Sequence, residues 1–178
     1  MSAQPDDSAP RTAAEENLSA TLTIAAPVAT VFAVLADPTT HAAIDGTGWI
    51  QEPVDRTPLA EPEQIFRMNM FHPNHPDGEY RVANKVHVFQ APHAIGWLTG
   101  TEKNGRLEFG GWFWRYDLAP HGPSGTEVTL TYDWSAVPPS VREYIQFPPF
   151  GTEHLTNSLR HLAELAASAP AREVREPR

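Results

Sequence analysis

The chain has 178 residues, no cysteine and a net charge of −9 at pH 7. The length suits one domain with a substantial core, and the lack of thiols argues against disulfides, a thiolate nucleophile and a cysteine-bound zinc. The acidic charge without a basic stripe argues against nucleic acid and anionic membranes as partners, since clustered Lys and Arg bind both. No segment reads as a signal peptide or a membrane span, so we expect a cytoplasmic protein without membrane insertion.

The two ends of the chain differ in composition from its body. Residues 1–17 are rich in Pro, Ala, Ser and acidic residues, and residues 168–178 are similar. Such segments bury too little apolar surface to offset chain entropy, so we expect both to be disordered tails. The body, 18–167, shows no internal repeat and no linker, and we expect one domain there.

A strand and two short helices are expected at the start of the body. Apolar and small polar residues alternate over 18–26, as they do along a strand. Pro27 suits the first turn of a helix, where its missing N–H costs nothing. The apolar residues that follow recur with helical spacing: Val28, Val31, Phe32 and Leu35. Asp37 is expected to cap a second short helix, which carries His41.

A series of strands and one long helix are expected in the rest of the body. After a loop with a short edge strand near 46–58, strand patterns cover 63–72, 79–90, 94–101, 108–119 and 126–136. The apolar spacing over 150–168 is helical, with one stripe that contains Leu155, Leu159 and Leu162. This order predicts an α+β fold, in which a curved antiparallel sheet of six to seven strands packs against a long C-terminal helix.

Aromatic residues concentrate in the last two strands. Because side chains alternate across a strand, Trp112, Trp114 and Tyr116 share one face. The expected hairpin pairs Leu118 with Val128, Tyr116 with Leu130, Trp114 with Tyr132, and Trp112 with Trp134. The earlier strands are expected to add these residues to the same concave side: Phe66, Met68, Met70, Val82, Asn84, Val86, Val88, Ile95 and Trp97. Such a surface is either ordinary core or the wall of an apolar pocket, in which Asn84 would orient a ligand.

The order of the segments resembles the START/SRPBCC superfamily, and within it the bacterial polyketide cyclase/dehydratase and lipid-transport branch. The resemblance covers about residues 18–167 and is carried by IAAPVATVFAVLADPTTHAAID, EYRVANKVHVFQAP, IGWLT, WRYDLAP, GTEVTLTYDW and the closing helix. It implies a helix-grip fold, with an apolar cavity between the sheet and the C-terminal helix. It does not select a function, because the superfamily includes binders, carriers and cyclases.

Several polar residues are candidates for chemistry. His41 and Asp45 are four apart on a predicted helix, a spacing that brings them within reach as an acid/base pair; a surface His and a turn-forming Asp are the alternative. His72 and His75 lie in a loop without a third ligand nearby, so we expect no metal, and no motif indicates another cofactor. His154 shares a flank of the last helix with Ser158, which is either a cavity rim or a solvent-exposed face. The preceding segment around Phe150 suits a lid or a hinge.

Three functions are consistent with the sequence. The first is binding of an apolar, aromatic or polycyclic molecule of polyketide or lipid type. Its candidate contact residues are Trp49, Met68, Met70, Asn84, Trp97, Trp112, Trp114, Tyr116, Tyr132, Trp134, Phe150 and Ser158. The second is a polyketide aromatase/cyclase or dehydratase, in which His41 and Asp45 move protons. The third is a protein-binding module like the cochaperone members of the superfamily. The oligomeric state does not follow from the sequence.

Overall fold

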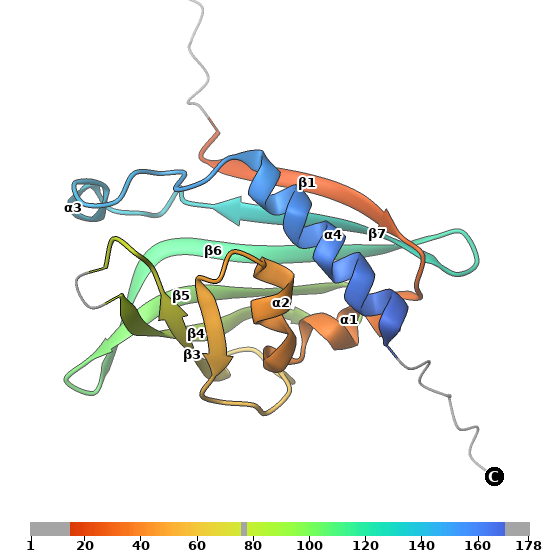
Figure 1. Cartoon of the computed structure of the whole chain (residues 1–178), viewed down its shortest axis with the longest axis horizontal. Coiled ribbons are helices and arrows are strands. Elements are labelled where there is room, and N and C mark those ends of the chain that lie inside the picture. Colours follow the sequence, from red (N-terminus) through yellow and green to blue (C-terminus); the bar gives the residue numbers. More distant parts are fainter. Residues whose placement is uncertain (1–14, 76–77, 170–178) are drawn as a thin grey trace, which may run out of the picture.

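One seven-stranded antiparallel sheet forms the centre of the computed structural model, which describes residues 15–75 and 78–169 (Figure 1). Its strands run in the order β1-β7-β6-β5-β4-β3-β2. Their bounds are β1 Asn17–Ile24, β2 Ile50–Pro53, β3 Ile65–Phe71, β4 Glu79–Gln90, β5 Ala94–Lys103, β6 Arg106–His121 and β7 Gly125–Asp133. The five strands expected after residue 62 are therefore confirmed: the bounds of β4 agree with the prediction, and the ends of the other strands differ by at most three residues.

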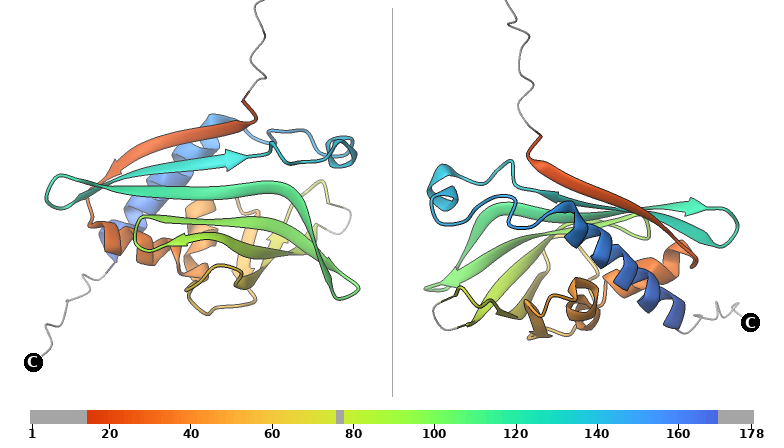
Figure 2. Two further views of the ribbon diagram at one scale, coloured as in Figure 1. Left: turned by 180° about the vertical axis from the view of Figure 1, so that it is seen from behind. Right: turned by 45° about the horizontal axis from the view of Figure 1, so that its top comes forward.

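The helices are α1 Val28–Leu35, the 3₁₀ turn η1 Pro38–Thr40, α2 His41–Asp45, α3 Pro139–Arg142 and α4 Thr152–Ser168. Helices α1, α2 and α4 lie on one face of the sheet, whereas the short α3 lies past the end of β7 (Figure 2). The long helix α4 packs on β1, α1 and α2, and this confirms the predicted α+β arrangement of a curved sheet around a C-terminal helix. The tails expected at 1–17 and 168–178 lie largely outside the described residues; within them, Asn17 already belongs to β1 and Ser168 still belongs to α4.

Local sequence explains how the first helices begin. Pro27 is the N-cap residue of α1, one position earlier than predicted, and its extended backbone leads from β1 into the helix. The Asp37 carboxylate accepts a hydrogen bond from the Thr39 N–H at 2.9 Å. This is the capping contact expected of Asp37, although the capped element is the 3₁₀ turn that runs directly into α2.

The leucine stripe of α4 forms the centre of the core. Leu155, Leu159 and Leu162 are fully or almost fully buried, together with Val128 and Leu130 of β7. Burial of each such side chain contributes about 1.5–3 kcal/mol. The predicted helical spacing therefore identifies the face of α4 that holds the helix against the sheet.

A β-bulge in β4 changes which side chains face the helices. Val86 pairs with Trp97, whereas Val88 pairs with Gly96, so the register shifts between these two residues. One inserted residue reverses the alternation of faces along a strand. Phe89 consequently contacts Phe32 of α1, with ring centroids 5.5 Å apart, and the assignment of Val88 to the inner face was wrong.

A second irregularity separates two tryptophans that were expected to pair. Three of the expected pairs of the β6–β7 hairpin are confirmed, including Trp114 with Tyr132, but the ladder ends where Phe113 meets Asp133. Between β5 and β6 the register shifts around Gly111, whose φ is +98° and where a Cβ would lie 2.5 Å from the Ala136 carbonyl oxygen. Beyond this point Trp112 packs on Phe147 at 5.7 Å instead of pairing with Trp134.

Truncation within the leucine stripe tests whether α4 packing stabilises the fold. We expect Leu159→Ala to lower the free energy of unfolding by about 2–5 kcal/mol, because it leaves a cavity between α4 and the sheet. Urea unfolding followed by circular dichroism measures this change. Arg160→Ala, at an exposed position of the same helix, is the control and should change stability by less than about 0.5 kcal/mol. Equal effects of the two substitutions would contradict the assignment of the core.

Candidate functional site

Five aromatic side chains meet between the sheet and the N-terminal end of α4. We call them the ring cluster: Trp49, Trp114, Tyr132, Phe150 and His154. The Phe150 ring is stacked on Trp114 at 5.5 Å between centroids, and it lies 4.9 Å from Tyr132 and 4.5 Å from His154. Trp114 and Tyr132 are cross-strand neighbours with centroids 4.6 Å apart. Trp49, which follows α2 in the chain, completes the cluster at 6.0 Å from His154.

The segment between β7 and α4 covers the ring cluster. It brings Phe150 onto Trp114 and Phe147 onto Trp112. A hollow of about 470 Å³ lies within this segment and is lined by residues 142–147. A second hollow, of about 290 Å³, is lined by Gln51, Glu52, Asn69, Met70, Glu79 and Tyr80. The concave side is therefore closed over the rings by Phe150 itself.

One carboxylate and one imidazole lie at the edge of the ring cluster. Asp45 Oδ1, at the end of α2, is 3.4 Å from His154 Nε2, and the two side chains are only 10% and 11% exposed. Asp45 Oδ2 accepts hydrogen bonds from the N–H of Thr47, at 3.2 Å, and from its hydroxyl. Burial lowers the pKa of His154, the charge of Asp45 partly offsets this, and nearby His161 lowers the pKa further. A neutral imidazole therefore lies beside the carboxylate at neutral pH.

A close contact between α2 and α4 sets the position of this pair. His161 lies two turns after His154, so both rings reach α2 from the same side of α4. The Nδ1–H of His161 donates to the Ile44 carbonyl oxygen at 2.9 Å. Gly46 ends α2 with φ +69°, and a Cβ there would lie 2.3 Å from the His161 ring. Glycine thus permits both the left-handed turn and the approach of the two helices.

Comparison with known proteins identifies the fold. No family model matches the sequence. The chain is 28% identical over 123 residues to the uncharacterised Mycobacterium tuberculosis protein Rv0088; the match covers 67% of this chain, which spans about half the length of that relative. The structure resembles Ms6760 from Mycobacterium smegmatis, with a TM-score of 0.60, 19% identity and coverage of 85% of this chain and 91% of the other.

Two enzymes of different origin have similar structures. For the ZhuI aromatase/cyclase from Streptomyces sp. R1128, the TM-score is 0.60 at 15% identity, over 85% of this chain and 93% of the other. For a norcoclaurine synthase point mutant from Thalictrum flavum, solved with a transition-state analogue, the TM-score is 0.59 at 13% identity over the same shares. The chain shares with these proteins the helix-grip fold that was expected from its sequence. At these identities the likeness concerns the fold alone.

Within this helix-grip fold, His41 and Asp45 do not form the expected pair. His41 is only 5% exposed, and its Nε2–H donates to the Leu35 carbonyl oxygen at 2.8 Å. Its ring is stacked on Trp97 at 4.9 Å. His41, at the start of α2, contacts the end of α1 and Trp97 of β5, whereas Asp45, at the end of α2, contacts His154 of α4. The Asp45 carboxylate lies beside His154 instead. From the sequence, His154 was expected only to share one side of the last helix with Ser158.

The other expected contact residues fall into two groups. Trp49, Trp114, Tyr132 and Phe150 belong to the ring cluster, and Trp134 adjoins it through Tyr132 at 5.8 Å. Trp97 is partly buried and lies 6.0 Å from Tyr116, which is buried together with Met68 and Ser158. Met70 lines the smaller hollow, and Trp112 lies under Phe147. The Asn84 side-chain oxygen accepts a hydrogen bond from the Thr99 hydroxyl of β5 at 2.8 Å, so this oxygen has a partner within the protein.

The described residues form neither a membrane-spanning helix nor a cluster of metal ligands. None of their helices is long and apolar enough to cross a bilayer. Across the same part of the chain, no three His, Cys, Asp or Glu side chains gather closely enough to hold a metal ion.

Protonation of buried histidine links the stability of the fold to pH. Burial lowers the pKa of His41 below its usual value of about 6.5. Below pH 6.5 the unfolded chain therefore takes up a proton that the folded chain does not, and stability falls with falling pH. We expect His41→Asn to reduce the slope of unfolding free energy between pH 6.5 and 5 by up to about 1.4 kcal/mol per pH unit. Urea unfolding at pH 8 isolates the packing cost of the substitution, and an unchanged slope would contradict this expectation.

Proposed function

We propose that the chain binds an apolar small molecule with an aromatic or polycyclic group at the ring cluster, where β6, β7 and α4 meet. The observation that carries this proposal is the position of Phe150, which is stacked on Trp114 and packed against Tyr132. A planar ligand group that displaces Phe150 gains equivalent stacking contacts, about 0.5–1.5 kcal/mol per aromatic pair beyond the burial of its area. Phe150 thus holds the position against Trp114 and Tyr132 that the planar group of the ligand would take.

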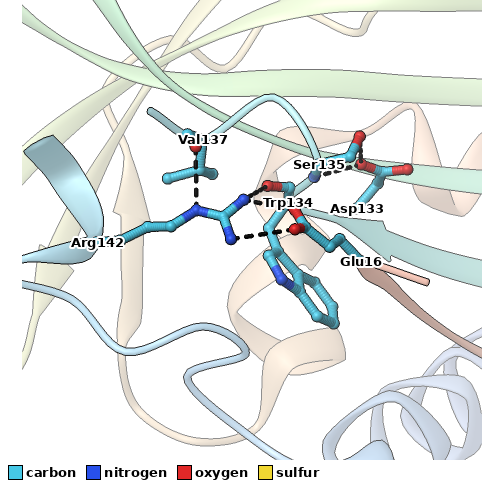
Figure 3. A network of polar contacts seen from close by, with 6 residues as sticks. All are labelled: Glu16, Asp133, Trp134, Ser135, Val137 and Arg142. Carbon is cyan, nitrogen blue, oxygen red and sulfur yellow. Dashed lines mark hydrogen bonds and ion pairs between the residues drawn. The ribbon is translucent and has the colours of Figure 1, made fainter. Parts of the chain in front are cut away.

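The anchoring of the covering segment supports this exchange. Figure 3 shows Arg142 holding the base of the segment: its Nε donates to the Val137 carbonyl oxygen and its Nη2 to the Trp134 carbonyl oxygen, each at 3.0 Å. The guanidinium also binds the Glu16 carboxylate, with Nη1 3.2 Å from Oε1. Beyond this anchor the segment is largely exposed, and Tyr144 is 87% exposed. Residues 143–151 can therefore move away from the rings while α4 and β7 keep their packing.

Loss of the stacking surface should weaken binding. We expect Trp114→Ala to raise the Kd for 2-(2-naphthyl)ethanol at least tenfold, about 1.4 kcal/mol, measured by isothermal titration calorimetry. Phe113→Ala is the matched control, because Phe113 points to the opposite face of the same strand and contacts His87. Phe150→Ala should not weaken binding, since it removes the competing ring. Absence of saturable binding by the unmodified protein would overturn the proposal, as would equal losses in Trp114→Ala and Phe113→Ala.

The Asp45–His154 contact favours a second candidate, a polyketide aromatase/cyclase or dehydratase. The neutral imidazole would accept a proton from carbon next to a carbonyl group, and the resulting enolate carbon would attack a second carbonyl to form a ring. The new alkoxide would then take the proton back from the imidazolium. Asp45 would stabilise the charged imidazolium between these two steps. One structural neighbour is an aromatase/cyclase, which agrees with this candidate.

Kinetics of a histidine variant separate catalysis from binding alone. We expect His154→Gln to lower cyclisation of a short poly-β-ketone thioester by about 10²-fold or more, with the Kd for the naphthyl alcohol nearly unchanged. Product formation is followed by liquid chromatography and mass spectrometry. His87→Gln, on an exposed position of β4, serves as the control. Turnover by the unmodified protein no faster than the uncatalysed reaction would remove the catalytic candidate and leave the binding function.

A further inference from the structure

Asp45 is a negative charge enclosed by aromatic side chains. Its carboxylate is 10% exposed and lies against His154, which Trp49, Trp114 and Phe150 surround at 4.5–6.1 Å between ring centroids. Among residues 15–75 and 78–169, no Lys or Arg nitrogen lies within 4 Å of this carboxylate. Its neighbour His154 is neutral at pH 7, because burial lowers its pKa. Within the described residues, Thr47 donates the hydrogen bonds to the Asp45 carboxylate, and His154 lies beside it at 3.4 Å.

The negative potential extends from Asp45 toward the smaller hollow. Burial raises the pKa of Tyr80, and the charge of Asp45 raises it further. Tyr80 in turn lines the hollow of about 290 Å³, whose two charged side chains are Glu52 and Glu79. Glu52 meets only the exposed Arg56 at 3.7 Å, a contact that solvent largely screens. Tyr80 is thus close both to the glutamates of this hollow and to Asp45.

We propose that the ligand of this site is an organic cation, in which an aromatic or polycyclic group carries a protonated amine or a quaternary ammonium. The inference rests on the binding function proposed above and adds the charge of the ligand. The planar group would take the place of Phe150 against Trp114, and the ammonium would lie beside Asp45. Aromatic faces attract cations, and the attraction is stronger when the cation is removed from water.

The state of Asp45 before binding explains why a cation is selected. A carboxylate that folding has already removed from most of its water has lost solvation that a surface carboxylate keeps. An ammonium ion restores a favourable partner to that charge, whereas an alcohol does so only as a hydrogen-bond donor. A carboxylate or phosphate ligand would place a second negative charge in the same site. The ranking expected for ligands of one shape is ammonium, then alcohol, then carboxylate.

Three probes of nearly equal shape test the charge selection. They are 2-(2-naphthyl)ethylamine, 2-(2-naphthyl)ethanol and 2-naphthylacetate, titrated by calorimetry at pH 7 and physiological salt. We expect the amine to bind at least tenfold more tightly than the alcohol, and the acid to bind most weakly. Asp45→Asn should remove the preference for the amine, so that the Kd values of the amine and the alcohol differ by less than about threefold. Glu127→Gln, which removes one exposed carboxylate of β7, should keep the preference.

The outcomes distinguish this inference from the function on which it rests. If the unmodified protein binds the alcohol as tightly as the amine, the cation inference is overturned and the binding function stands. If none of the three probes binds, both fail. A preference that survives in a folded Asp45→Asn protein would overturn the assignment to Asp45. The ranking of the three probes by the unmodified protein decides the charge question even if Asp45→Asn fails to fold.

Discussion

The packing of α4 across the concave face of the sheet is the interaction on which the rest of the structure depends. Leu155, Leu159 and Leu162 are buried against β7 and its neighbours, and this contact fixes both the position and the rotation of the helix. Once the leucines face the sheet, His154 and His161 on an adjacent side of the helix must face α2. The geometry of the candidate site is therefore a consequence of core packing. The orientation of α4 that buries its leucine stripe also places His154 beside Asp45.

The contact between α2 and α4 turns this packing into a specific polar site. Gly46 allows the His161 ring to approach the end of α2, and the hydrogen bond to Ile44 holds it there. With the helix end held, Asp45 lies between the Thr47 hydrogen bonds and His154. A buried carboxylate is costly unless its oxygens have partners, and here the turn after α2 supplies them. The site therefore combines aromatic rings that can stack on a ligand with the negative charge of Asp45.

Irregularities in the strands decide which rings take part. The bulge in β4 turns Phe89 toward α1, and the shift near Gly111 separates Trp112 from Trp134. Trp114 and Tyr132 stay in register between these distortions, so they present a continuous pair of rings to Phe150. The surface that we propose for ligand binding thus lies where β6 and β7 pair regularly, and the register shift near Gly111 of β6 marks its boundary on one side. Phe147 covers that boundary through its contact with Trp112.

The sequence by itself determined the order of the elements, the stripe of α4, the cap at Asp37 and the pairing of Trp114 with Tyr132. These features follow from periodicity and local capping, which act over a few neighbouring residues. Only the tertiary structure decided the partner of Asp45, because a spacing of four residues with His41 says nothing about a helix more than a hundred residues away. The faces of Val88 and Trp112 were also decided in three dimensions. A β-bulge reverses the alternation of side chains, and no glycine marks the bulge of β4, whereas Gly111 is a local signal for the irregularity of β6.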